Sequence, residues 1–206
     1  MKAVLLVALI ALPISARAQD APRVGLTMGY PSSVGVIWRL NDRVAVRPEV
    51  TLSRSTGDVT GSDVSGLSPI TTNDSTGAGV GISALFYLHR WDGLRTYVSP
   101  RFSYSRISAS ASTSGSTLLS DSTASLYLTS GSFGAQYSLG RHFGLFGEIG
   151  LGYTATTTTA TSTLTISITT FVNGVATATT RTQLVTSGSH SNTVATRSGV
   201  GVIFFF

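Results

Sequence analysis

The chain has 206 residues, 14 basic and nine acidic side chains, and a formal net charge of +5. It contains no cysteine, which excludes a disulfide scaffold, thiol chemistry and thiolate metal sites. The basic residues after Lys2 are arginines spread singly along the chain, so the positive charge does not indicate nucleic-acid binding. Gly, Ser and Thr dominate the polar residues, a composition that favours strands and loops over helices.

The N-terminus has the features of a signal peptide. Met1 and Lys2 form a short positive region, an apolar stretch follows from Ala3 to Pro13, and small residues flank Arg17. We therefore expect cleavage before Gln19, with a signal peptide at 1–18 and a single exported domain at 19–206. An N-terminal membrane anchor is the less favoured alternative, because the apolar run is short for a membrane-spanning helix.

Apolar and polar residues alternate in the first half of the chain, the pattern of strands whose two faces meet different surroundings. The clearest example is Val44–Arg54, where valines, Pro48 and Leu52 occupy one face and Arg47 and Glu49 the other. A polar segment from Ser55 to Thr76 predicts a long loop. The predicted strands of this half are Arg23–Tyr30, Val34–Leu40, Val44–Arg54 and Gly77–His89.

The second half continues the same alternation. A second long loop is predicted from Ser108 to about Thr123, and short turns lie at 41–43, 91–93 and 140–142. Asn173-Gly174, between β-branched runs, predicts a hairpin of Thr156–Val172 and Val175–Val185 that extends the last two strands. The predicted strands of this half are Arg95–Ile107, Ser125–Leu139, Phe143–Ala155 and Thr193–Phe206.

The chain ends with apolar residues at alternate positions up to a terminal aromatic: Val200, Val202, Phe204 and Phe206. This ending resembles the closing strand of bacterial outer-membrane β-barrels, in which such residues form an insertion signal. Eight strands with alternating short turns and long loops are similar to the small eight-stranded outer-membrane barrel family, which includes OmpA-like transmembrane domains and OmpX-like surface barrels. Aromatic residues toward both ends of the strands agree with two interfacial belts.

The resemblance implies an all-β, antiparallel, up-and-down transmembrane barrel in the bacterial outer membrane. It also implies contact with membrane lipid and lipopolysaccharide, help from the barrel assembly machinery during insertion, and no nucleic-acid partner. The expected function is a closed structural barrel whose extracellular loops, above all the long hairpin, meet a surface ligand. The alternative is a narrow channel for small solutes. A soluble barrel with an apolar interior is the remaining possibility.

Charged residues on the predicted lumen faces lie at comparable distances from the short turns. They predict a buried cluster of Arg47, Glu49, Arg101, Glu148 and Arg197. Because buried charges need partners, the cluster is expected to be a salt-bridged plug rather than a selectivity constriction. Eight strands leave little room for a channel, which favours the plug.

No catalytic set can be assembled from the sequence. His190-Ser191-Asn192 faintly resembles the His-x-Ser-Asn motif of lipid A deacylases, but His190 and Ser191 are adjacent and would point to opposite faces of a strand. We expect this segment to be a surface loop. His89 and His142 have no ligand partner in the sequence. The expectation is therefore no enzyme activity, no cofactor and no metal site.

Overall fold

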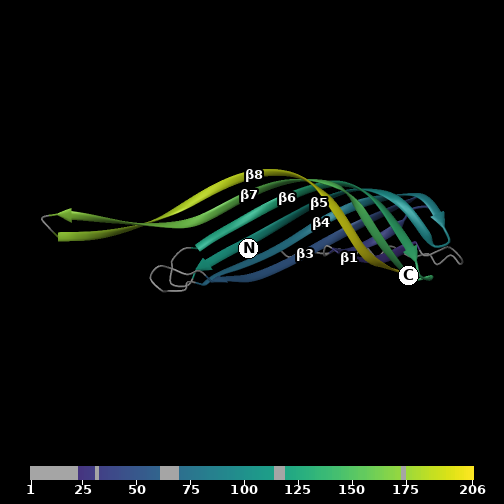
Figure 1. Ribbon diagram of the computed structural model, residues 1–206, viewed down its shortest axis with the longest axis horizontal. Helices are drawn as coiled ribbons and strands as arrows, with labels where there is room; N and C mark the ends of the chain where they lie inside the picture. Colours follow the sequence, from purple (N-terminus) through teal and green to yellow (C-terminus); the bar gives the residue numbers. More distant parts are fainter. Residues whose placement is uncertain (1–22, 31–32, 61–69, 114–118, 173–174) are drawn as a thin grey trace.

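The computed structural model describes residues 23–30, 33–60, 70–113, 119–172 and 175–206. Eight antiparallel strands form a closed barrel in which each strand pairs with its neighbour in sequence and β1 pairs with β8 (Figure 1). The predicted all-β fold is confirmed. The strands are β1 Val24–Tyr30, β2 Ser33–Arg39, β3 Val44–Thr60, β4 Ile70–Trp91, β5 Leu94–Thr113, β6 Leu119–Ser138, β7 Phe143–Val172 and β8 Val175–Phe205.

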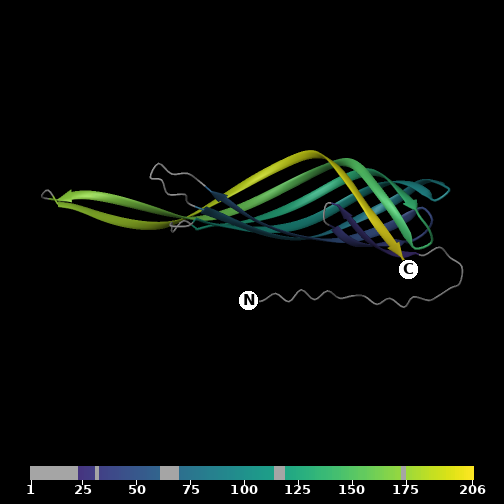
Figure 2. The ribbon, with the colours of Figure 1, turned by 60° about the horizontal axis from the view of Figure 1, so that its bottom comes forward.

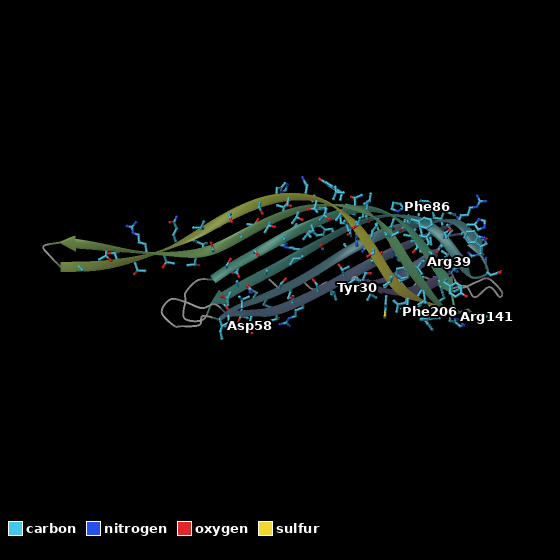
Figure 3. All side chains as sticks on the ribbon, in the orientation of Figure 1. Tyr30, Arg39, Asp58, Phe86, Arg141 and Phe206 are labelled. Carbon is cyan, nitrogen blue, oxygen red and sulfur yellow. The ribbon has the colours of Figure 1, made fainter. Side chains whose placement is uncertain are left out.

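Three short turns and the C-terminus lie at one end of the barrel, which we call the short-turn end. Asn41 stabilises the first turn, because its side-chain oxygen accepts hydrogen bonds from the backbone N–H groups of Arg43 and Val44, both at 2.8 Å. Gly93 has a φ of 92°, which suits glycine in the tight turn between Trp91 and Leu94. Figure 3 shows Arg141 and Phe206 together at this end.

The barrel carries its apolar face outward. On β3, Val50 is 49% exposed, whereas Arg47 and Glu49 are only 3% and 5% exposed in the lumen. The other strands show the same arrangement, with large apolar side chains such as Ile82, Phe133 and Ile149 exposed on the outer face. A soluble barrel places its apolar side chains inside, so this arrangement contradicts that alternative. Among the described residues, the structure contains no helix long and apolar enough to cross a membrane.

The strands away from the short-turn end are longer than the sequence predicted. β3 continues to Thr60 and β4 begins at Ile70, so most of the predicted loop 55–76 is paired strand. β5 and β6 likewise extend to Thr113 and from Leu119, where a loop was expected over 108–123. These segments carry Ser, Thr and other polar residues on both faces. The backbone ladder persists there, but the apolar–polar alternation that marks a strand does not.

β7 and β8 project beyond the other strands as a two-stranded extension, residues 163–172 and 175–184 (Figures 1 and 2). The last pair between β6 and β7 is Ser120 with Ser162, whereas β7 and β8 stay paired as far as Val172 and Val175. The predicted long hairpin is therefore confirmed in the pairing of 162–172 with 175–185, whereas residues 156–162, which the prediction included, also pair with β6 in the barrel wall. Its turn residues Asn173 and Gly174, and the predicted signal peptide, lie outside the described residues.

β1 and β2 are the shortest strands, and their neighbours continue past them. The last pairs are Tyr30 with Val200 of β8, and Ser33 with Thr51 of β3. β3 then runs on to Thr60, and β8 extends in the opposite chain direction to Val175. Figure 3 shows Tyr30 well short of Asp58, which lies near the far end of β3. Among the described residues, no pairing joins β3 to β8 beyond the ends of β1 and β2.

Candidate functional site: the lumen charge cluster

Four of the five predicted lumen charges form a connected cluster. β3 supplies Arg47 and Glu49, which share the inward face because they are two residues apart. Arg47 spans the lumen: its Nε lies 3.0 Å from Glu49 Oε1, and its NH2 lies 2.8 Å from Glu148 Oε1 on β7. Arg101 of β5 places its NH2 2.6 Å from Glu49 Oε2. This last contact is an ion pair, since Glu49 Oε2 accepts no well-aligned hydrogen bond.

Neutral side chains add one hydrogen bond to each of the two carboxylates. Ser83 Oγ on β4 donates to Glu49 Oε1 at 3.0 Å, and Tyr97 OH on β5 donates to Glu148 Oε1 at 2.8 Å. Arg47 Nε also donates to Ser83 Oγ at 3.3 Å. The cluster therefore ties β3, β4, β5 and β7 together across the lumen, and charge-assisted hydrogen bonds are the stronger kind.

Arg197 of β8 lines the same cavity but does not join the ion pairs. Its side chain is half-buried, and its NH1 atom is buried without a hydrogen-bond partner among the described residues. Arg197 thus lies beside the cluster, and among the described residues it forms no ion pair with either carboxylate. The cavity beside it has a volume of about 40 Å³.

Aromatic side chains enclose the cluster. The ring of Phe146 packs against the guanidinium of Arg47, 5.1 Å from its Cζ to the ring centroid. Tyr97 lies over Gly134, where an added Cβ would come within 2.5 Å of the tyrosine ring. Glycine at that position therefore makes room for the ring that holds Glu148. Sequence reasoning missed Ser83, Tyr97 and Phe146, although bulky residues that interrupt a polar face were a usable signal.

A second, apolar layer fills the lumen between the charge cluster and the short-turn end. Its members are 0–3% exposed: Ile37, Ala45, Leu85, Tyr97, Ile203 and Phe205. Two arginines border this layer over aromatic rings, Arg39 at 4.3 Å from the Phe205 centroid and Arg95 at 5.7 Å from that of Tyr87. The closure predicted from the sequence rested on the charge cluster alone, and this apolar layer was not predicted.

The C-terminal residues lie on the outer face as their alternation predicted. Val200, Phe204 and Phe206 are exposed, Val202 is half-buried, and Phe205 points inward. β8 is held on both sides, because Phe204 pairs with Leu26 of β1 and with Phe143 of β7. Their role as an insertion signal remains a prediction.

The histidines do not gather into a site. His190 and Ser191 lie within β8, paired with Thr157 and Thr156, so the expectation of a surface loop there was wrong. His190 Nδ1 is 2.9 Å from Thr157 Oγ1, and its side chain is exposed. His142 Nδ1 lies 3.0 Å from the Phe205 carbonyl oxygen. In the described part of the chain, no three His, Asp or Glu residues are grouped as a metal site would require.

An apolar exterior, a narrow closed wall and a lumen filled by side chains define a small β-barrel of the outer-membrane type. A major outer membrane protein from Thermus thermophilus has a similar structure, with a TM-score of 0.55 and 13% identity over 91% of this chain and 100% of that chain. CarO from Acinetobacter baumannii shares 16% identity over the same fractions of the two chains, but with a TM-score of 0.36.

At these identities the Thermus likeness is one of fold alone, because one fold hosts many functions. No protein-family model and no curated protein matches the sequence. Membership of the OmpA-like or OmpX-like family is therefore not shown.

Proposed function

We propose that this chain is a bacterial outer-membrane barrel with a closed lumen, which presents the β7–β8 extension outside the cell. In this proposal the short-turn end faces the periplasm, and the exposed apolar band contacts membrane lipid and lipopolysaccharide. The outward alternation ending at Phe206 supports insertion by the barrel assembly machinery. The long polar strands at the opposite end agree with the asymmetry of single-chain outer-membrane barrels.

The burial of the lumen side chains is the observation that supports a closed barrel. A water-filled channel would leave the side chains that line it exposed. Here the members of the apolar layer are 0–3% exposed, and the paired Arg47 and Glu49 above it are 3% and 5% exposed. The two layers act in series, so a solute would have to displace both an apolar contact and a set of ion pairs.

The first prediction concerns conductance. The refolded chain, added to a planar lipid bilayer, should insert without giving discrete, reproducible current steps, because both layers block the lumen. Insertion is checked separately by the heat-sensitive electrophoretic mobility of a folded barrel. Defined steps from inserted, folded protein would instead support the alternative of a narrow channel, with Arg101 and Glu49 as its selectivity residues.

The β7–β8 extension is the element best placed to contact a partner. Beyond Ser162 it has a free edge on each strand among the described residues, and such edges can pair with an extended segment of another molecule. Its exposed residues between Thr179 and Leu184 are mainly polar, and three of them, Thr179, Thr180 and Thr182, carry hydroxyl groups. These features support a role in surface interaction.

The second prediction tests this role by shortening the extension. Thr161 pairs with Thr186, so residues 162–185 can be replaced by Asn-Gly to close a two-residue hairpin at that pair. The shortened protein should insert and keep its thermal stability, because apart from the Ser120–Ser162 pair the removed strands pair only with each other. It should, however, lose binding to host or bacterial surfaces. Unchanged surface binding by the shortened barrel would contradict the proposed role of the extension.

A further inference from the structure

The barrel wall has a notch where β1 and β2 end. Past the pairs Tyr30–Val200 and Ser33–Thr51, β3 and β8 continue without a strand between them among the described residues. On the β8 side, the exposed Val194 belongs to the apolar outer face and lies beyond the last β1 pair. The notch therefore begins within the apolar band, and not only in the polar region beyond it.

Two cavities lie on either side of the barrel wall at the edge of this notch, and they share lining residues. The lumen cavity of about 40 Å³ is lined by Arg101 and Arg197 and reaches Gly29 and Ser33. On the outer face, a hollow of about 270 Å³ is lined by Met28, Gly29, Ser33, Val34, Val50 and Leu52. Gly29 and Ser33 line both spaces, so a charged interior site and an apolar exterior surface adjoin across the ends of two strands.

The charge in the lumen cavity is unbalanced. Arg47, Arg101 and Arg197 face only two carboxylates, those of Glu49 and Glu148, and the ion pairs join Arg47 and Arg101 to them. Arg197 is left with a buried NH1 atom that has no hydrogen-bond partner among the described residues. A buried guanidinium that has an unsatisfied N–H group and no ion pair is costly, and a bound anion would relieve that cost.

We propose that the notch binds a long-chain carboxylate, a fatty acid whose head group lies against Arg197 and whose chain leaves over Gly29 and Ser33 into the outer apolar hollow. The cavity beside Arg197 has room for roughly three water-sized groups, which matches the size of a carboxylate. A guanidinium binds a carboxylate through two parallel hydrogen bonds. The proposal goes beyond the closed-barrel function and requires only that the barrel be folded in lipid.

Binding of radiolabelled oleate to the full chain in nanodiscs of zwitterionic lipid tests this proposal, with empty nanodiscs subtracted. At alkaline pH, where the carboxylate is ionised, the protein should bind oleate saturably at one site. Methyl oleate, which has the same chain without the charge, should bind roughly tenfold or more weakly, because it cannot form the charge-assisted hydrogen bonds. Equal binding of the two ligands, or uptake that does not saturate, would overturn the proposal.

Substitutions on β8 identify the residue responsible. Arg197→Gln should weaken oleate binding by roughly tenfold or more and leave methyl oleate unaffected, whereas Arg197→Lys should restore part of the difference. Arg181→Gln is the matched control, since Arg181 is an exposed arginine of the same strand in the extension. Equal oleate affinity in Arg197→Gln and Arg181→Gln would exclude the site. The comparison of oleate with its ester on the unmodified protein keeps the test decisive if Arg197→Gln does not fold.

The absence of current through the barrel and the saturable binding of oleate are independent results. A conducting barrel that binds oleate would contradict the proposed function and leave the notch site standing. A barrel that passes no current and binds oleate no better than methyl oleate would support the proposed function and contradict the notch site.

Discussion

Replacing Glu49 by glutamine should lower the free energy of unfolding by about 3–5 kcal/mol, the cost of leaving a buried charge without its partner. Glu49 accepts a hydrogen bond from Arg47 on one oxygen at 3.0 Å, and its other oxygen forms an ion pair with Arg101 at 2.6 Å. Its neutralisation leaves Arg47, Arg101 and Arg197 facing Glu148 alone. Reversible urea unfolding in lipid vesicles, followed by tryptophan fluorescence, measures the effect.

Asp58→Asn is the matched control for this substitution. Asp58 lies on the same strand, loses the same charge, and is exposed near the far end of β3 (Figure 3). Its replacement should change the unfolding free energy by less than about 0.5 kcal/mol. Equal effects of the two substitutions would show that the cluster does not hold the lumen together. A channel would respond differently, since Glu49→Gln would alter ion selectivity while the stability changed little.

The part of the fold that could be predicted from sequence is the part with two different environments. On β3, alternation between Val50 outside and Glu49 inside is visible because lipid-facing and lumen-facing positions select different residues. From Arg54 onward the two faces become equally polar and the alternation vanishes, although pairing with β4 continues to Thr60. The predicted strand ends were therefore wrong where the backbone pairing of two strands continues through polar residues.

The charge cluster was predictable because heights along neighbouring strands can be counted from the short turns. Arg47, Glu49, Arg101 and Glu148 meet as that count predicts. Counting residues from the short turns gives no distance across the lumen. It could therefore not show that Arg47 contacts both carboxylates or that Arg197 has no ion pair with either of them. Nor does period-two alternation distinguish a polar lumen from an apolar one. Ile37, Leu85 and Ile203 occupy lumen positions, and only their clustering near the short turns could have revealed the layer.

Leu85→Ala tests the apolar layer directly. Leu85 is 1% exposed and points into the lumen from β4, among Ile37, Tyr97 and Phe205. The substitution should lower the unfolding free energy by about 2–5 kcal/mol, because the rigid wall of the barrel cannot collapse onto the cavity that remains. The measurement is again reversible urea unfolding in vesicles.

Leu88→Ala separates loss of packing from loss of apolar surface. Leu88 lies on the same strand, 58% exposed on the outer face, where lipid chains can fill the space that its side chain leaves. Its replacement should therefore cost clearly less than that of Leu85, although the two changes remove the same atoms. Leu85→Ala should also stay electrically silent, because the ion pairs of Arg47 still block the lumen beyond the apolar layer. Equal losses at the two positions would mean that the inward layer is no better packed than the lipid-facing surface, and current through Leu85→Ala would mean that the apolar layer alone closes the barrel.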